Sequence, residues 1–289
     1  MVDDMTAPTA RSMWPVFETY HAVTYFAPES AEGYRNLGLK GGWMGYFASR
    51  AAPMGPVPPE VVTAVFFNFH PAMVARAIPD AWALADPADV LAVRLRAVDG
   101  ALRRLLPDHV EAPETVEAAG LAREASLAGH ITGRPLYGGL RSLPWPEEPH
   151  LALWHAATLL REHRGDGHVA SLLAEGLDGV EAHVTAAAAG QIPREMLQVN
   201  RKWDDDEWLA AEERLRARGW LNLQGGLTEE GRAGRQRIED RTDELASEPW
   251  RFLGLEGTAR LAELWPPMAR AIVDGGGVPI PSPIGAPAP

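Results

Sequence analysis

The sequence contains no cysteine and almost no lysine. Without cysteine there is no disulfide framework, no cysteine-ligated zinc or iron–sulfur site and no thiol nucleophile. Lys40 and Lys202 are the only lysines, and acidic residues outnumber basic ones to give a net charge of -12. Broad phosphate-binding surfaces are built from clustered basic residues, so this charge argues against nucleic acid as a partner.

Long apolar runs are also missing. The stretch Val61–Phe67 falls far short of the roughly 20 apolar residues that a membrane-spanning helix needs. The first residues, Met1–Asp4, are acidic where a secretory signal is basic. We therefore expect a cytoplasmic protein that has no contact with membranes. A chain of 289 residues that is 46% hydrophobic is typical of a folded protein with two domains.

Helical periodicity runs through most of the chain. Apolar residues recur at helical spacing over Asp86–Leu106, and Pro113–Ala128, Glu229–Ala246 and Thr258–Val273 also predict helices. The segment Val61–Phe69 fits either a buried helix or a strand. We therefore predict a mainly α-helical protein.

The segment 133–149 is rich in glycine and proline and is the candidate domain boundary. It separates an N-terminal helical domain, residues 1–132, from a C-terminal domain, residues 150–274. Residues 275–289 are of low complexity, and we expect them to form a disordered tail.

The C-terminal domain has a recognisable order of elements. The helix His150–His163 is followed by a turn at Gly165–Gly167, three further helices and a hairpin signal around Gly225-Gly226. The segments Arg214–Leu221 and Leu227–Arg232 carry a pattern that resembles MarR-type winged helices. In those proteins a glycine ends the helix in the recognition position and the hairpin forms the wing.

The first half carries a similar but fainter pattern, since Gly55-Pro56-Val57 can be aligned with Gly167-His168-Val169. Any two helical halves can also be aligned in this way. More widely, the strings Leu153–His168 and Arg50–Gly55 resemble an actinobacterial group of SalK-type helix-turn-helix proteins of unknown function. This resemblance implies a mainly α fold with small β-hairpin wings, arranged as tandem MarR-like winged-helix domains. It implies no catalytic residues.

The charge of the helix in the recognition position argues against DNA binding. This helix begins with the acidic run Asp204–Glu207, and its arginines lie at the far end. The N-terminal end of a recognition helix approaches DNA, so these carboxylates would repel the phosphates. Arg201 and Lys202 just before the helix argue the other way. The alternative is that the acids only cap the helix and complement its dipole.

The densest group of titratable residues includes His163, Asp166 and His168. Two histidines and a carboxylate could hold a metal, or a carboxylate could orient a histidine that acts as general base. The alternative is structural, with Asp166 as a helix cap in a turn and the histidines partly buried. We take the three as candidate catalytic residues and do not predict a metal site.

A second group joins aromatic and polar side chains. If the two halves pack face to face, they could line a pocket with aromatic walls and a few polar anchors. The candidate ligand-binding residues are Trp43, Tyr46, Arg50, Asn68, His70, His155 and Arg161. The alternative is that aromatic residues at helical spacing belong to the core.

These observations favour a small-molecule-binding winged-helix protein that has lost DNA binding. Its ligand would be aromatic or hydrophobic, and the protein would be either a binding protein or an enzyme of specialised metabolism. No nucleotide-binding, metalloprotease or serine-hydrolase motif occurs, and the cofactor stays unknown. The alternatives are a MarR-like, ligand-responsive transcription regulator and a scaffold protein. We also consider a homodimer.

Overall fold

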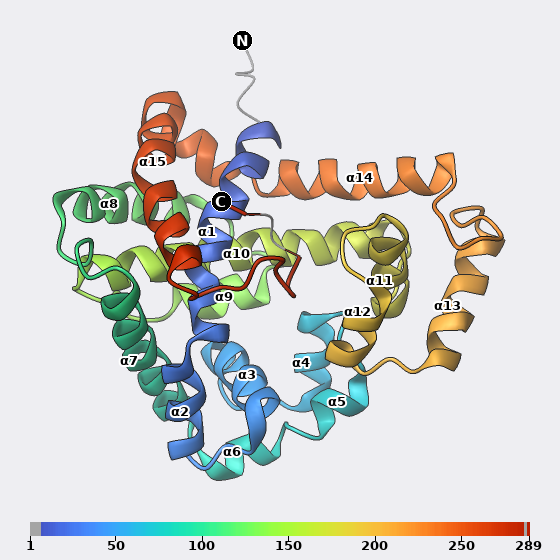
Figure 1. The fold of residues 1–289 in the computed structure, drawn as a ribbon, viewed down its shortest axis with the longest axis horizontal. Helices are drawn as coiled ribbons and strands as arrows, with labels where there is room; N and C mark the ends of the chain where they lie inside the picture. The colour runs from blue at the N-terminus through green and yellow to red at the C-terminus, as the bar shows by residue number, and fades with distance from the viewer. Residues whose placement is uncertain (1–6, 286–287) are drawn as a thin grey trace.

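A computed structural model describes residues 7–285 and 288–289 of the chain (Figure 1). The helices follow in the order α1 (Ala7–Phe26), α2 (Pro28–Asn36), α3 (Gly41–Ala51), the 3-10 helix η1 (Ala52–Met54), α4 (Pro59–Phe66), α5 (Pro71–Ala75), α6 (Asp80–Leu84), α7 (Pro87–Leu105), α8 (Pro113–Ala128), α9 (Pro135–Arg141), α10 (Pro149–Ala174), α11 (Gly179–Ala188), α12 (Arg194–Arg201), α13 (Asp205–Ala217), α14 (Glu229–Leu245) and α15 (Glu248–Asp274). Proline is the first residue of several of these helices, where its fixed φ suits the helix and its missing N–H costs nothing. Much of the proline in the sequence therefore marks where helices start.

The structure is helical, but the predicted fold class with small β-hairpin wings is wrong. No strand occurs in residues 7–285, and Leu221 and Leu227 form one isolated antiparallel bridge. The side chain of Asn222 accepts hydrogen bonds from the backbone N–H groups of Gln224 and Gly226 at 3.0 Å each. The amides of this short loop therefore turn inward to one side chain, and no ladder extends beyond the bridge. Without wings, the tandem winged-helix arrangement loses its defining element.

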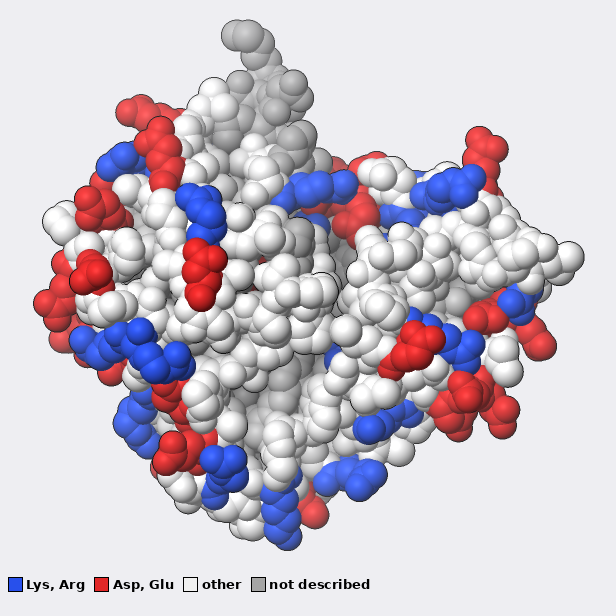
Figure 2. Space-filling model, viewed as in Figure 1, with Lys and Arg blue, Asp and Glu red and all other residues white. Residues whose placement is uncertain are grey.

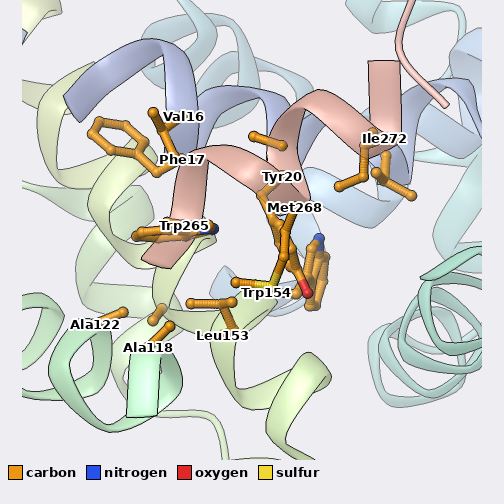
Figure 3. Close-up of a cluster of buried hydrophobic side chains, with 14 of the residues drawn as sticks. Val16, Phe17, Tyr20, Ala118, Ala122, Leu153, Trp154, Trp265, Met268 and Ile272 are labelled. Carbon is orange, nitrogen blue, oxygen red and sulfur yellow. The ribbon is translucent and has the colours of Figure 1, made fainter. Parts of the chain in front are cut away.

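The largest hydrophobic cluster lies around α10, which packs against α1, α7, α8, α9 and α14. Figure 3 shows Leu153 and Trp154 of α10 beneath Tyr20 of α1 and Trp265 of α15. The rings of Tyr20 and Trp265 meet edge to face with centroids 6.1 Å apart. Helices from both ends of the sequence therefore share one core.

Two smaller clusters flank this core. One is centred on α3, where Phe47 is fully buried against Phe66 and Phe69. The other holds α11, α12 and α13 together around Trp208 and Trp220. In Figure 1, α14 runs alongside α10, and α13 lies at the far right edge of the molecule. The described part of the C-terminal segment returns to the main core, where Val278 is buried.

The predicted turn at Gly165–Gly167 is wrong, because α10 continues through it to Ala174. A Cβ atom on Gly167 would lie 3.0 Å from Nη1 of Arg134 and 3.2 Å from Cβ of Leu245. Glycine therefore allows α14 and Arg134 to approach α10 closely. Close packing, and not a change of chain direction, therefore explains why position 167 is a glycine.

None of the helices within the described residues has the length and apolarity that crossing a membrane requires. The expected division of the chain at 133–149 stays a prediction. That segment contains the helix α9, whose residues Tyr137 and Leu140 are buried against Leu159 of α10.

Candidate functional site

A buried cluster of charged side chains lies where α1, α3 and α10 meet. Arg50 donates from Nε and Nη2 to the two carboxylate oxygens of Glu162, at 3.0 Å each. Arg161 donates to the same carboxylate at 2.8 Å and to Glu18 at 3.3 Å. Burial alone would raise the pKa of Glu162, but Arg161 and Arg50 outweigh it and hold that pKa well below its usual value. Glu162 is therefore ionised between two arginines.

Four of the predicted ligand-binding residues belong to this cluster or border it. The hydroxyl of Tyr46 accepts a hydrogen bond of 2.9 Å from Arg50, and the Arg50 guanidinium lies 4.2 Å from the ring centroid of Phe66. Trp43, one turn before Tyr46, is 36% exposed and meets its ring at 5.5 Å. The structure therefore brings Tyr46, Arg50 and Arg161 together, and their role in binding stays a prediction.

A cavity of about 160 Å³ lies beside this cluster, between α1, α2 and α3. Its walls include three tyrosine rings and several small hydroxyl side chains. The lining residues include Thr24 and Tyr25 of α1, Ser30 and Tyr34 of α2, and Tyr46 and Ser49 of α3. Gly45 lets Tyr34 of α2 pack directly against α3, because a Cβ atom there would lie 2.7 Å from the Tyr34 ring.

Three residues that line this cavity carry a hydroxyl group without a hydrogen-bond partner among the described residues. They are Thr24, Ser30 and Tyr34, whose side chains are buried. The hydroxyl oxygens themselves have almost no accessible surface, so they lie behind the cavity wall and do not face the open space. An unpartnered buried polar atom costs about 1 to 3 kcal/mol, so these groups lower the stability of the fold beside the cavity.

A chain of hydrogen bonds behind the cavity determines which atoms of Tyr25, His21 and Thr158 carry a proton. His21 joins Thr158 through Nδ1 at 2.9 Å and Tyr25 through Nε2 at 2.8 Å. Burial lowers the pKa of His21 well below its usual value, so the ring is neutral and carries one proton. Thr158 donates its own proton to the carbonyl of Trp154, so it accepts from Nδ1 of His21. Nε2 then accepts the proton of Tyr25.

The three residues predicted to be catalytic all lie on α10 but face different neighbours. His163 is buried against the ring of Tyr137, at a centroid distance of 4.9 Å, and its Nε2 has no partner within the described residues. Asp166 accepts a hydrogen bond of 3.0 Å from the backbone N–H of Tyr137. Burial lowers the pKa of His163 to about 3 and raises the pKa of Asp166 to about 7.

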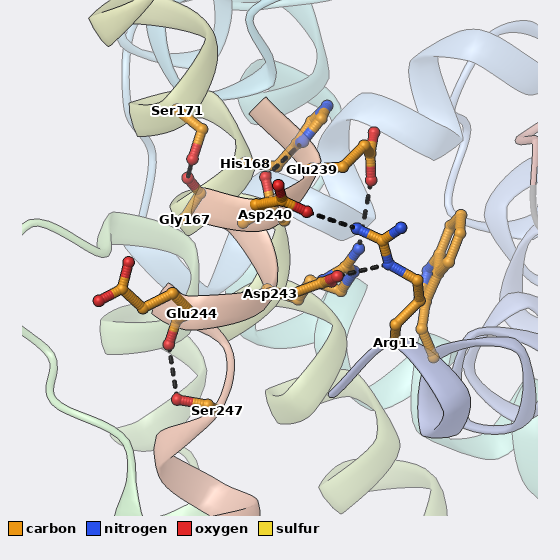
Figure 4. A network of polar contacts seen from close by, with 12 residues as sticks. Arg11, Gly167, His168, Ser171, Glu239, Asp240, Asp243, Glu244 and Ser247 are labelled. Atoms are coloured by element: carbon orange, nitrogen blue, oxygen red, sulfur yellow. Dashed lines mark hydrogen bonds and ion pairs between the residues drawn. The ribbon is translucent and has the colours of Figure 1, made fainter. Parts of the chain in front are cut away.

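His168 points to the other side of α10. Its Nδ1 lies 3.0 Å from the hydroxyl of Thr242 on α14, close to the ion pairs that join Arg11 of α1 to Asp240 and Asp243 (Figure 4). Burial lowers the pKa of His168 to about 4. The structure therefore does not bring His168 to the Tyr137 side with His163 and Asp166. No group of three or more His, Asp or Glu side chains in the described part of the chain could hold a metal ion.

His155 lies apart from the other candidates. Its ring meets Trp145 edge to face at 4.7 Å, and its Nε2 is unpartnered among residues 7–285. Burial lowers the pKa of this histidine to about 4, and Arg94 and Arg123 lower it further. It is a neutral histidine on the side of α10 that faces the Trp145 loop.

Asn68 and His70 lie where the first half of the chain meets α12 and α13. The backbone N–H of His70 donates to the carbonyl of Arg201 at 3.0 Å, and its Nε2 lies 2.9 Å from Glu207 of α13. The backbone carbonyl of Asn68 accepts from Trp203 and from His183, at 3.0 Å each. These two residues therefore join the halves of the molecule and are not part of the cavity.

The N-terminal end of α13 is acidic and is already bonded within the molecule. Asp204 and Glu207 form a capping box, and Glu207 also pairs with His70. Acidic side chains gather at this end, at the lower right of the molecule in Figure 2. Asp205 accepts from Arg194 at 2.7 Å. The alternative role of these acids, capping of the helix, is therefore seen for Asp204 and Glu207.

The arginines at the other end of α13 are also engaged. Arg214 pairs with Asp178 and Glu181 at 2.7 and 2.8 Å. Arg218 donates to two carbonyls at the end of α10, and Arg216 pairs with Glu212 on its own helix. Arg201 lies over the ring of Phe69 at 4.4 Å, and Lys202 remains exposed.

Helices α12 and α13 are joined by the short connection 202–204, in which Lys202 takes a left-handed conformation with φ 66°. A model of a helix-turn-helix family matches residues 10–279. The chain belongs to this helix-turn-helix family. No curated protein matches the sequence, and no solved structure matches it. Membership of the helix-turn-helix family fixes neither a ligand nor a reaction.

Several groups of the site gave no sequence signal. Glu162 stands directly after Arg161, but nothing in the sequence shows that Arg50 would reach it from a distant helix. Thr24, Ser30 and Tyr34 carry hydroxyl groups like many other residues, and only the fold places them around one space. Tyr25 and His21 lie four residues apart on α1, but the sequence does not indicate that they form a hydrogen bond.

Proposed function

We propose that this helix-turn-helix family protein binds a small molecule in the cavity between α1, α2 and α3 and does not bind DNA through α13. The observation that carries the proposal is a space of about 160 Å³ lined by the aromatic side chains of Tyr25, Tyr34 and Tyr46, beside the buried pair of Arg50 and Glu162. Small-molecule sites are concave spaces with mainly aromatic and apolar walls and a few polar groups.

The state of α13 supports the second half of the proposal. A recognition helix needs free cationic side chains for phosphates and free polar side chains for base edges. In this helix Arg214, Arg216 and Arg218 bond to neighbours in the same molecule. The acidic end, where Asp205 and Asp206 are exposed, would face the phosphates. Binding to DNA would therefore cost both broken ion pairs and charge repulsion.

We do not propose a reaction. His163 and Asp166 face Tyr137, whereas His168 faces Thr242. General acid–base catalysis requires the acid and the base to reach one substrate. A role for the protein as an enzyme would need a different set of groups, so binding is the function that we propose.

A gel mobility-shift titration with genomic DNA fragments tests the DNA half. We expect no complex for the wild-type protein, and weak, salt-sensitive binding for the double variant Asp205→Lys, Asp206→Lys. A wild-type complex that weakens steeply between about 50 and 200 mM salt would contradict the proposal and favour the alternative, a DNA-binding regulator.

A thermal-shift screen of single-ring metabolites tests the ligand half. The variant Ser30→Leu adds bulk at a buried residue that lines the cavity, and Ser142→Leu makes the same chemical change at an exposed position. We expect at least one compound to raise the melting temperature of the wild type and of Ser142→Leu, but not of Ser30→Leu. If no compound separates Ser30→Leu from the other two proteins, the ligand half is wrong.

A further inference from the structure

The size of the cavity limits the ligand to about one ring. Its volume of about 160 Å³ is close to that of an engineered apolar cavity of about 150 Å³ that binds benzene. Tyr25, Tyr34 and Tyr46 line the space from three helices, and aromatic side chains pack well against a planar ring. A single ring is therefore the framework of the ligand, and the charges around the cavity decide which substituent it carries.

The interior beside the cavity holds a cation that no carboxylate among the described residues pairs with. Arg94 of α7 is 3% exposed and donates from Nη1 to the backbone carbonyl of Ser49, a lining residue, at 3.2 Å. Its Nε is buried without a partner, and its guanidinium lies 4.8 Å from the ring centroid of Trp154. Burial lowers the pKa of Arg94, and Glu162 offsets this effect only in part. The partners of this buried positive charge are therefore neutral groups.

The carboxylates of the charged cluster do not compensate Arg94. Glu162 pairs with Arg50 and Arg161, and Glu18 pairs with Arg161. The three arginines and the two glutamates are all largely buried, so the interior behind the cavity has an excess of one positive charge. Charges interact strongly over several ångströms where water is excluded. An anion in the cavity would therefore be stabilised by Arg94 without touching its Nε.

The lining groups on α3 are able to donate hydrogen bonds to such an anion. Tyr46 accepts from Arg50, so its own proton is free to donate. Gly41 and Gly42, the first residues of α3, also line the cavity. The helix has no capping side chain among the described residues and no acid in its first turn, so its first N–H groups are left unpaired. The start of a helix in this state favours a negative charge beside it.

The remaining lining groups indicate where the two ends of the ligand lie. Arg35, in the last turn of α2, is an exposed cation at the cavity, and no carboxylate lines the space within residues 7–285. Tyr25 gives its proton to His21, so it offers only oxygen lone pairs. The anionic group is therefore expected near Arg35 and the start of α3, with the ring against Tyr25 and Tyr34.

We propose that the cavity binds a negatively charged single-ring compound, whose anionic group lies beside Tyr46 and the start of α3 and balances the charge of Arg94. This inference rests on the proposed function and names the charge of its ligand. Benzoate is the probe. Benzamide and benzamidine have nearly the same shape, but at pH 7 benzamide is neutral and benzamidine is positively charged.

Calorimetric titration of the full chain with these three probes tests the charge of the ligand. We expect saturable binding of benzoate, at least about tenfold tighter than that of benzamide, and still weaker binding of benzamidine. Ser30→Leu should lose benzoate binding and Ser142→Leu should keep it, if the bound benzoate lies in the cavity. Equal or tighter binding of benzamide or benzamidine would overturn the inference. Absence of benzoate binding, or its persistence in Ser30→Leu, would overturn it as well.

A variant at position 94 tests the role of the buried cation. Arg94→Gln removes the charge but can still donate a hydrogen bond to the Ser49 carbonyl. We expect it to lower the preference for benzoate over benzamide about tenfold. Arg96→Gln, at an exposed position of the same helix, should leave the preference unchanged. If Arg94→Gln weakens both probes to the same degree, Arg94 only supports the end of α3 and its assigned role is wrong.

The start of α3 provides an independent test. Gly42 is exposed and has nothing within 4 Å of its Cβ position, so a side chain can be added there. Gly42→Asp places a carboxylate where it stabilises the helix but competes with a bound anion, and Gly42→Asn differs from it in charge. We expect Gly42→Asp to melt at a higher temperature than Gly42→Asn and to bind benzoate about tenfold more weakly. Equal benzoate binding by the two variants would contradict the placement of the anionic group.

The outcomes separate the inference from the proposed function. If neutral or cationic single-ring compounds stabilise the wild type but not Ser30→Leu, and benzoate binds no better than benzamide, the anionic class fails and the binding function stands. If no compound distinguishes Ser30→Leu from the wild type, the proposed function itself fails.

Discussion

The face of α13 and the cavity between α1, α2 and α3 use polar side chains in opposite ways. On α13, Arg214 and Glu207 are bonded to neighbouring elements of the same molecule. At the cavity, Tyr46 is a lining residue whose hydroxyl accepts from Arg50 and donates its own proton to no described residue. Polar groups that are already bonded inside a protein have little left to offer a ligand, whereas unpartnered ones gain from it. The helix-turn-helix family suggests a functional site on α13, whereas the bonding of the side chains favours a site in the cavity.

The largest effect is expected where the charged cluster beside the cavity is broken. Arg50→Met removes both hydrogen bonds from Arg50 to Glu162 and leaves this buried carboxylate with Arg161 alone. Loss of one partner of a buried ion pair costs about 3 to 5 kcal/mol of unfolding free energy. Urea unfolding measures the change. Arg260→Met, whose partner Glu117 is exposed, should change nothing measurable, and equal effects in the two variants would contradict the buried pair.

A change at Asp166 is expected to have an intermediate effect on stability. The carboxyl group of Asp166 is buried, and its partner is the uncharged N–H of Tyr137. Burial raises the pKa of Asp166 in the folded protein to about 7. The folded state then binds more protons than the unfolded state between pH 4 and 7, so this residue lowers stability as the pH rises through that range. Asp166→Asn should therefore be more stable than the wild type by about 2 to 4 kcal/mol at pH 8, with the difference shrinking toward pH 4.

Thermal unfolding of Asp166→Asn and of the wild type across this pH range measures the difference. The neighbouring His163, whose pKa is lowered to about 3, acts in the opposite direction below about pH 6.5 in both proteins and cancels in the comparison. A constant difference between the two proteins from pH 4 to pH 8 would mean that the carboxyl group is not titrating near pH 7.

A smaller effect is expected at the contact between the first half and α11. A Cβ atom on Gly179 would lie 2.4 Å from the carbonyl oxygen of Phe67. Gly179→Ala should therefore destabilise the protein by about 1 to 3 kcal/mol, as overpacking does. Gly120, in α8, has nothing within 4 Å of its Cβ position, so Gly120→Ala should have no such cost. Similar unfolding midpoints for the two variants would contradict the close contact.

The smallest effect is expected for His70→Ala. This change removes the contact between His70 and Glu207 and the hydrogen bond from the N–H of Ala72 that caps α5. Both sites are partly exposed, so we expect a loss of about 1 kcal/mol. Hydrogen exchange should become faster at the start of α13 and stay unchanged in α8. Unchanged exchange in α13 would mean that His70 does not hold this helix.

The sequence predicted the helices better than their arrangement. Pro113–Ala128 agrees with α8 in both bounds, because proline marks its start and helical spacing is a local property. The prediction of a hairpin was wrong. Gly225-Gly226 indicates a turn, but the number of paired residues on either side of it depends on the hydrogen bonds that the Asn222 side chain accepts. The turn at Gly165–Gly167 failed because glycine also serves close packing, and the packing partners are distant in sequence.

The candidate site was predictable only in part. Helical spacing places Tyr46 and Arg50 on one face of a helix, and the structure joins them to Arg161 through Glu162. Periodicity says nothing about which residues of α2 face α1 and α3, so Ser30 and Tyr34 were missed. Spacing along α10 did not show that His168 would turn toward α14, because the partner of a buried histidine is set by tertiary packing.

The most direct test of the central claim is a crystal structure of the protein with a single-ring compound that raises the melting temperature of the wild type but not of Ser30→Leu. We predict that the ring lies between α1, α2 and α3, in contact with Tyr25, Tyr34 and Tyr46. A compound bound elsewhere, with only water between these helices, would contradict the claim.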